Sequence, residues 1–190
     1  MKKKENRTAF VILGLLSHEN LSGYQLKKQI DAGLKEFWSA GFGQLYPTLK
    51  ELREKGLIEA VTEGGNKRGL TVFSITDAGR AALKEWLRKP VLQQTVKYDI
   101  LLKLYFGAAL KPEENLVKID NFRKQAEMQM EKYAQYEQVL RSVLDDSDDH
   151  TYFLLTVLFG RKVTKATLEW AEESRQLLIN LKKEKKEPER

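Results

Sequence analysis

The segment from residue 43 to residue 54 carries side chains that could contact nucleic acid, spaced as on an α-helix. At about 100° per residue, Leu45, Leu49 and Leu52 fall together as one apolar stripe that a core would bury. The other side of the helix offers hydrogen-bonding groups and a positive charge, which suit base edges in the major groove and backbone phosphates. The candidate DNA-binding residues there are Gly43, Gln44, Tyr46, Pro47 and Lys50.

Acidic residues limit how much of this helix could dock. Glu51 and Glu54 also point outward, but they lie further along the helix, where phosphates would repel them. We therefore predict that only the first half of the helix enters the groove. Two alternatives remain open, because Tyr46 could be a core aromatic residue and Lys50 a solvated lysine.

Two further groups of cations could bind phosphates. Lys67 and Arg68 lie at a predicted hairpin tip, among glycines that would let the backbone approach a phosphate or a narrow minor groove. Lys27 lies beside Lys28 on the helix before the candidate docking helix, where it would add salt-dependent affinity without sequence preference. The alternatives are a solvated turn and ordinary exposed lysines.

The charge distribution favours a polyanionic partner for the first half of the chain. The 190 residues carry a net charge of +6. Residues 1–89 contain 16 lysines and arginines against 10 acidic residues, whereas residues 90–190 contain 17 of each. All of the excess positive charge therefore lies in the first half. Charge alone leaves a purely solubilising role for this excess as an equal alternative.

The composition excludes several classes of protein. Without cysteine the chain cannot hold a disulfide scaffold or a cysteine nucleophile, and a cytoplasmic location is expected. The apolar run at 9–16 is far shorter than the roughly 20 residues that span a bilayer, and no signal peptide is expected. His18 and His150 lie far apart in the sequence, and neither has a serine or cysteine nucleophile motif nearby. The sequence also contains no phosphate-binding loop motif. We expect no enzymatic activity, cofactor or bound metal.

The first half has the element order of a winged helix-turn-helix. Ser22 and Gln25 form a capping box at the start of the second helix, and Gly56 occupies the position of a C-cap glycine after the third. Two β-branched segments then predict a hairpin, which a fourth helix follows. The expected helices lie at 9–16, from 22 past 34, from 44 to about 55 and from 76 or 77 to 89, with strands at 57–62 and 70–75.

Beyond residue 90 the sequence predicts only helices, at roughly 94–110, 113–144 and 151–183. The two long helices each carry an apolar stripe that repeats every three or four residues. A helical hairpin with one short helix is too thin to bury both stripes, so self-association through this half is expected. The candidate dimer-interface residues are Phe122, Met130, Tyr133, Phe159, Val163, Trp170 and Leu177.

These patterns predict a mostly α protein with a small β-hairpin wing and two domains. A winged helix-turn-helix domain at 1–89 would bind double-stranded DNA, and an all-helical domain at 90–190 would dimerise, with a frayed tail from about residue 183. The rival function is a helical interaction module whose winged helix docks a protein instead of DNA.

Five motifs make the chain resemble the PadR-like transcriptional regulators. The most specific is Leu-Tyr-Pro-x-Leu-x-x-Leu at 45–52, followed by Gly-Leu-Ile at 56–58. The resemblance implies a homodimer that represses promoters and responds to a small, often aromatic, compound. It spans about residues 9–85, and the second half looks like that of members with a larger C-terminal dimerisation domain. The remaining motifs are Leu-Gly-Leu-Leu at 13–16, Ser-Gly-Tyr-Gln-Leu at 22–26 and Ile-Thr-Asp-Ala-Gly-Arg at 75–80.

The wing of this chain departs from the pattern of many family members. Many family members have Arg-Pro-Arg-Lys in the wing, whereas this chain has Asn-Lys-Arg-Gly at 66–69, which keeps the cations and lacks the proline.

Trp38, Trp86 and Trp170 could stack on a flat effector. Aromatic residues at helical spacing belong more often to a core or an interface, so we assign no ligand-binding residue.

Overall fold

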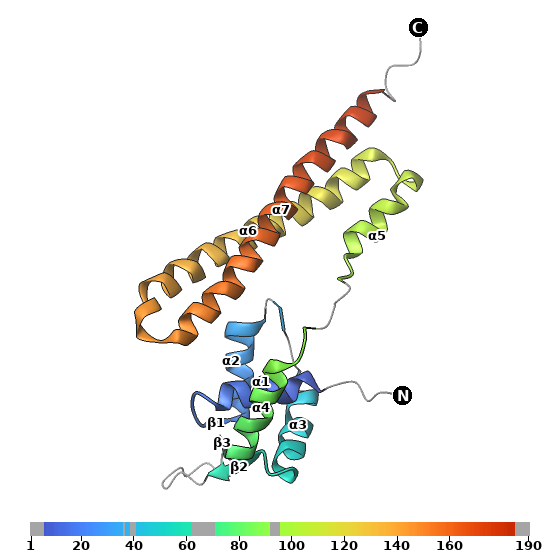
Figure 1. Ribbon diagram of the computed structural model, residues 1–190. Coiled ribbons are helices and arrows are strands. Elements are labelled where there is room, and N and C mark those ends of the chain that lie inside the picture. Colours follow the sequence, from blue (N-terminus) through green and yellow to red (C-terminus); the bar gives the residue numbers. More distant parts are fainter. Residues whose placement is uncertain (1–5, 36, 39–40, 62–70, 92–95, 185–190) are drawn as a thin grey trace. The chain divides into compact units, whose positions relative to one another are not determined.

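The chain folds into two compact units, residues 1–93 and 94–190, which are described separately (Figure 1). In a computed structural model, the described residues are 6–35, 37–38, 41–61, 71–91 and 96–184. The protein is mostly helical, with one small antiparallel sheet of three strands in the first unit. None of the helices within the described ranges is long and apolar enough to cross a membrane.

The first unit has the predicted order of helices around a hairpin. Its third helix, α3, spans Phe42–Glu54 and ends before Gly56, whose φ of 67° lies in the left-handed region that favours glycine. The other elements are α1 (Arg7–Leu16), β1 (Leu21–Ser22), α2 (Gly23–Gln29), a π-helical turn (Ile30–Leu34), β2 (Ile58–Val61), β3 (Val72–Ile75) and α4 (Asp77–Arg88).

Side-chain caps fix the starts of α2 and α4. The backbone N–H of Gln25 donates to Ser22 Oγ over 3.3 Å, and the backbone N–H of Ser22 donates to the side-chain oxygen Oε1 of Gln25 over 2.8 Å. These two hydrogen bonds confirm the predicted capping box. At α4 the Gly79 amide donates to Thr76 Oγ1 over 3.1 Å, so Thr76 is the N-cap. Both helices therefore begin where local sequence dictates.

The sheet contains one strand that the sequence pattern does not predict. Its order is β1-β3-β2, with both pairs antiparallel. Strand β1 is only two residues long and joins the sheet through the register Leu21↔Phe73 and Ser22↔Val72. A two-residue strand carries no period-2 pattern, so it is stabilised by pairing with β3 and not by its own sequence.

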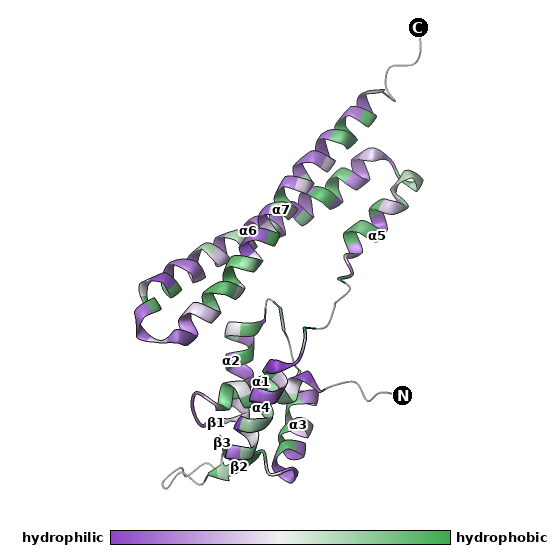
Figure 2. Cartoon of the chain, viewed as in Figure 1, coloured by the Kyte–Doolittle hydropathy of each residue, from purple (hydrophilic) through white to green (hydrophobic). Residues whose placement is uncertain are grey.

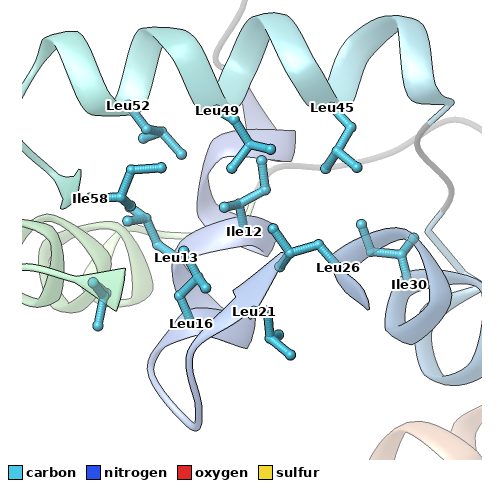
Figure 3. Close-up of a cluster of buried hydrophobic side chains, with 11 residues drawn as sticks. Ile12, Leu13, Leu16, Leu21, Leu26, Ile30, Leu45, Leu49, Leu52 and Ile58 are labelled. Carbon is cyan, nitrogen blue, oxygen red and sulfur yellow. The ribbon is translucent and has the colours of Figure 1, made fainter. Parts of the chain in front are cut away.

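The core of the first unit lies between α3 and the helices α1 and α2. Leu45, Leu49 and Leu52 are buried and point from α3 toward Ile12 of α1 and Leu26 of α2 (Figure 3). The apolar stripe predicted for residues 45–52 is therefore confirmed. It fixes which side of α3 faces the core, and so which side faces solvent.

The second unit is a long helical hairpin preceded by a short helix. Helix α6 spans Pro112–Ser142 and α7 spans Asp148–Glu184, joined by a 3₁₀ turn at Leu144–Asp146. Helix α5 covers only Asp99–Tyr105, followed by a 3₁₀ turn at Gly107–Ala109, so the single helix expected at 94–110 is shorter and broken. Helix α7 also begins three residues before the predicted Thr151.

An ion-pair cluster stabilises the contact between α6 and α7. Glu137 on α6 is buried and accepts hydrogen bonds from Arg141 on its own helix, over 2.9 Å, and from Arg161 on α7. The hydrogen bond from Arg141, more than that from Arg161, holds the pKa of Glu137 below its usual range, while burial opposes the shift. Two further pairs join the helices, Arg175 Nε with Asp120 Oδ1 at 3.0 Å and Lys182 Nζ with Glu113 Oε1 at 3.1 Å, so ion pairs along the length of the hairpin support its register.

Candidate nucleic-acid interface

The solvent-facing side of α3 carries all five of the residues expected to meet DNA on this helix. Tyr46 is 52% exposed and the side chain of Lys50 is 74% exposed. Gly43, Gln44 and Pro47 are exposed as well. The structure thus brings these residues together on one face, and Tyr46 is not a core aromatic residue.

The backbone in the first turns of α3 departs from the regular hydrogen-bonding pattern of a helix. Pro47 has no N–H, so the carbonyl oxygen of Gly43 receives no hydrogen bond from the residue four positions on. Thr48 Oγ1 donates to the carbonyl oxygen of Gln44 over 2.7 Å, an additional bond that commonly bends a helix. The N-terminal half of α3 therefore differs from a regular helix where docking is predicted.

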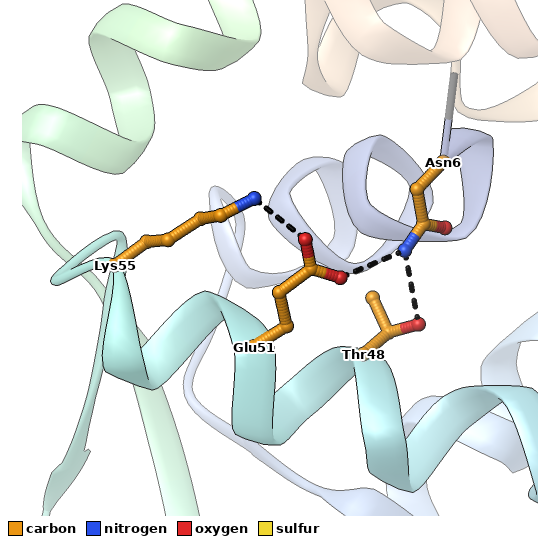
Figure 4. A network of polar contacts seen from close by, with 4 residues as sticks. All are labelled: Asn6, Thr48, Glu51 and Lys55. Carbon is orange, nitrogen blue, oxygen red and sulfur yellow. Dashed lines mark hydrogen bonds and ion pairs between the residues drawn. The ribbon is translucent and has the colours of Figure 1, made fainter. Parts of the chain in front are cut away.

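A polar network joins α3 to the start of α1 (Figure 4). It includes Glu51, one of the two acidic residues that limit docking, but not Glu54. Asn6 Nδ2 donates to Thr48 Oγ1 over 3.4 Å and to Glu51 Oε2 over 3.3 Å, and Lys55 Nζ donates to Glu51 Oε1 over 2.5 Å. The negative charge of Glu51 is thereby paired on the flank of α3. This pairing weakens the repulsion that its carboxylate would exert on a phosphate.

Lys50 is held only weakly on the surface of α3. Its Nζ lies 3.8 Å from Glu54 Oε1, and both side chains are more than half exposed. Exposed pairs of this kind contribute about 0–1 kcal/mol to stability. A phosphate or a base edge could therefore attract Lys50 away from Glu54 at little cost.

Lys27 occupies a different position from the free, exposed lysine that the sequence suggests. Its side chain is only 18% exposed and forms an ion pair with Asp31, one turn along. The pair lines an open hollow of about 500 Å³, whose other lining residues are Tyr24, Lys28 and Ala32. A phosphate contact by Lys27 would therefore compete with Asp31, whereas the neighbouring Lys28 is exposed.

The wing is described only at its base. Strands β2 and β3 pair through Val61↔Val72, the last register position before the tip. Lys67 and Arg68, the cations expected at the tip, lie outside the described residues. Their contact with DNA stays a prediction.

Helix α7 presents an apolar face that α6 does not cover. Phe159 and Leu177 are 73% and 70% exposed, and their separation of eighteen positions makes five turns, so both lie on one face. Val163 lies on the same side and is exposed, while the residues that α7 buries lie about half a turn away. Figure 2 shows hydrophobic and hydrophilic residues alternating along α7. The buried residues of α7 are Leu154, Val157, Thr164 and Ala171.

The residues of α6 expected at a dimer interface lie on its buried side within the chain. Tyr133 is buried against Gly160 of α7, where an added Cβ would come within 2.3 Å of the tyrosine Cζ. Phe122 meets Trp170 of α7 edge to face, with ring centroids 5.9 Å apart, and Met130 is half-buried. The intrachain hairpin accounts for the burial of Tyr133 without a second copy.

Comparison with known proteins identifies the family. The model of the transcriptional regulator PadR-like family matches residues 12–85, and a model described as virulence activator alpha C-term matches residues 96–178. The negative transcriptional regulator PadR of Bacillus subtilis is 33% identical over 171 residues, which are 86% of this chain and 92% of the relative. The chain belongs to the PadR-like family of transcriptional regulators.

Solved structures extend the likeness of this PadR-like regulator over nearly its whole length. The crystal structure of Bacillus subtilis PadR in complex with operator DNA has a TM-score of 0.82 at 28% identity, over 93% of this chain and 99% of the other. The same protein in complex with p-coumaric acid has a TM-score of 0.67 at 28% identity, over 89% and 96% of the two chains. The winged helix fold and the long C-terminal helices are thus shared.

Two of the three tryptophans of this PadR-like chain already pack against other aromatic rings. Trp86 stacks on Phe10 with centroids 4.8 Å apart and an interplanar angle of 7°, and Trp170 contacts Phe122. Trp38 Nε1 is buried and has no hydrogen-bond partner among the described residues. These placements do not assign an effector site.

One histidine of this regulator makes a contact within the fold, and the other lies at the surface. Nδ1 of His150 lies 2.5 Å from the carbonyl oxygen of Val143, a contact that closes the turn between α6 and α7. His18 is exposed after α1. Across the described ranges, no group of three acidic, histidine or cysteine side chains could hold a metal ion.

One residue that supports α3 from another helix has no signal in the sequence of this PadR-like chain. Asn6 contacts α3 across 42 and 45 positions, and an asparagine ahead of a helix carries no motif that predicts such a contact. Its obvious local role is an N-cap, yet its side chain makes no capping hydrogen bond. Only the packing of α1 on α3 reveals its partners.

Proposed function

We propose that this PadR-like regulator represses transcription as a homodimer bound to a pseudo-palindromic operator, and that a small aromatic compound releases it. The relative from Bacillus subtilis is named a negative transcriptional regulator, and its solved structures include one with operator DNA and one with p-coumaric acid. These properties of the relative support the proposal for this chain.

The observation that carries the proposal is the exposed face of α3. Burial of Leu45, Leu49 and Leu52 turns two side chains outward, Tyr46 near the start of the helix and Lys50 in its second half. Recognition helices contact base edges mainly through their N-terminal residues. The exposed face suits docking in the major groove for both side chains, and for Tyr46 the position near the N-terminal end does so as well.

The homodimer is supported by the uncovered face of α7. A dimer that buries the stripe containing Phe159 and Leu177 would remove a large apolar surface from water. A two-fold dimer would place two α3 helices in successive major grooves, roughly 34–36 Å apart. The operator should then consist of two related half-sites.

A titration against two duplexes tests the proposal. The protein is added to its own promoter region and to an unrelated duplex of equal length, at two salt concentrations. We expect preference for the promoter that survives at the higher salt. Equal, salt-sensitive binding would leave only non-specific affinity for DNA, and absence of binding to both would favour docking to a protein partner.

The effector is tested on the preformed complex with promoter DNA. Adding p-coumaric acid, the compound that the Bacillus subtilis relative binds, should release the DNA in a saturable manner. Benzoic acid at the same concentrations controls for unspecific effects of an aromatic carboxylate. Unchanged binding throughout the series would reject p-coumaric acid as the effector.

Replacement of Lys50 by alanine should weaken operator binding and change base preference. A specific side-chain contact with a base typically discriminates by about 1–3 kcal/mol, or roughly 5- to 150-fold. Affinities for a panel of single-base operator variants measure this effect. Lys84→Ala, which removes an exposed lysine of α4, is the matched control. Equal loss on every sequence would show that Lys50 contacts only phosphate.

Replacement of both Lys67 and Arg68 by alanine should flatten the salt dependence of binding. Each phosphate contact contributes about 0.9 to the slope of log K against log salt, so two lost contacts lower its magnitude by nearly 2. The slope is measured on the unrelated duplex, where base contacts do not interfere. An unchanged slope would remove the wing from the interface.

A further inference from the structure

We propose that Gly23 is a positioning residue for DNA binding, because its missing side chain lets the Tyr46 ring lie across the first turn of α2. This inference rests on the proposed function, in which the outer face of α3 meets the operator. It extends the interface to a buried residue that touches no DNA itself.

The contact between Gly23 and Tyr46 is close and involves the outer end of the ring. A Cβ added at Gly23 would lie 2.9 Å from Cε1 of Tyr46 and 3.3 Å from both Cζ and the hydroxyl oxygen. Distances below 3.0 Å require one of the two groups to move. Gly23 is buried, while Tyr46 remains 52% exposed. One part of the ring therefore rests on α2 and the rest faces solvent.

Two helices thus determine where the tyrosine hydroxyl lies. The backbone of Tyr46 is fixed by α3, whose Leu45 and Leu49 are anchored in the core. The far end of its side chain is fixed by the first turn of α2. A side chain that is ordered before binding loses less conformational entropy when it contacts a ligand. Gly23 therefore prepares Tyr46 for contact with DNA.

The backbone at position 23 does not itself require glycine. Among the described residues only Gly56 has positive φ, so Gly23 has a conformation that alanine could adopt. Gly23 is also the first residue of α2, after the Ser22 cap, and alanine has a higher helix propensity than glycine. The contact with the Tyr46 ring is then the reason for a glycine here.

Alanine at position 23 should displace the ring and leave the fold intact. The atoms that an added methyl group would meet form the end of a flexible, half-exposed side chain. We expect Gly23→Ala to weaken promoter binding about two- to tenfold, the effect of one rotamer that is no longer ordered. Thermal unfolding followed by circular dichroism should be unchanged.

The experiment is a double-mutant cycle on the promoter duplex at one salt concentration. Affinities are measured for the wild type, Gly23→Ala, Tyr46→Ala and the variant with both changes. Gly33→Ala is the matched control, because Gly33 lies in the π-helical turn that follows α2 and an added Cβ there meets nothing within 4 Å. If Gly23 acts through Tyr46, Gly23→Ala lowers affinity in the wild type and has no further effect on Tyr46→Ala.

The outcomes separate this inference from the proposed function. Equal loss from Gly23→Ala in both backgrounds, or no loss in either, would overturn the positioning role. So would unchanged binding by Tyr46→Ala in a protein that otherwise prefers its promoter. Should Gly23→Ala lower stability, the variant with both changes relieves the contact and restores the fold, so the cycle still decides. Failure of the wild type to bind both the promoter duplex and the unrelated duplex of the earlier titration would reject the proposed function itself.

Discussion

Replacing Phe159 by glutamate should convert the protein from a dimer into a monomer and weaken operator binding by about a hundredfold or more. The Phe159 side chain is 73% exposed within one chain, so a charge there leaves the fold of that chain intact. In a dimer it would be buried in the apolar face of α7, where an unpaired carboxylate is strongly unfavourable. A monomer binds one half-site and loses the gain of linked binding, which amounts to about 10²–10⁴.

Sedimentation equilibrium and an operator titration together test this expectation. The wild type should sediment at twice the chain mass of 22.0 kDa and Phe159→Glu at the chain mass. Lys165→Gln is the matched control, since it makes the same change in net charge on an exposed part of α7 away from Phe159. A Phe159→Glu protein that stays dimeric with full operator affinity would exclude this face from the interface.

Local signals predicted the helices of the first unit well because the ends and faces of these helices are determined locally. The Ser22 capping box, the Thr76 cap and Gly56 all lie where their side chains or backbone angles act. The stripe of Leu45, Leu49 and Leu52 then determined the buried side of α3 through helical geometry alone. The candidate residues on the opposite side followed without further information.

Periodicity could not decide which partner each long helix of the second unit packs against. Tyr133 and Phe159 both belong to apolar stripes with the same spacing. In the structure, Tyr133 faces α7 within the chain, whereas Phe159 faces outward. Helix α7 has one apolar face for α6 and another that α6 leaves uncovered, and a stripe in a sequence does not record which helix covers it.

Contacts between distant residues were equally hidden from the sequence. The approach of Tyr46 to Gly23 depends on how α3 lies on α2, which no local pattern records. The pairing of Lys27 with Asp31 is a local contact instead, since residues four apart on a helix lie side by side and the sequence could have predicted this ion pair. Sequence patterns therefore indicate which face is exposed, and the structure shows which charges on that face are already engaged.

Replacing Gly79 by alanine should destabilise the first unit by about 3 kcal/mol, the upper part of the usual range for overpacking. A Cβ at this buried position in α4 would lie 2.1 Å from the carbonyl oxygen of Leu57 and 2.8 Å from Cγ1 of Ile75. The carbonyl belongs to the backbone and also accepts the Thr76 amide over 3.2 Å, so it cannot move freely. Helix α4 must therefore shift away from the hairpin, or this part of the unit unfolds.

The same substitution at Gly14 should have the opposite sign, which makes it the matched control. Gly14 lies inside α1 and an added Cβ meets nothing within 4 Å, so alanine should stabilise the helix by roughly 0.5–1 kcal/mol. Urea unfolding of both variants, followed by circular dichroism, measures the two changes. The contrast isolates packing from helix propensity, because both glycines lie in helices and only Gly79 abuts a backbone carbonyl. A Gly79→Ala protein as stable as Gly14→Ala would show that α4 is not seated on the Leu57 carbonyl as described.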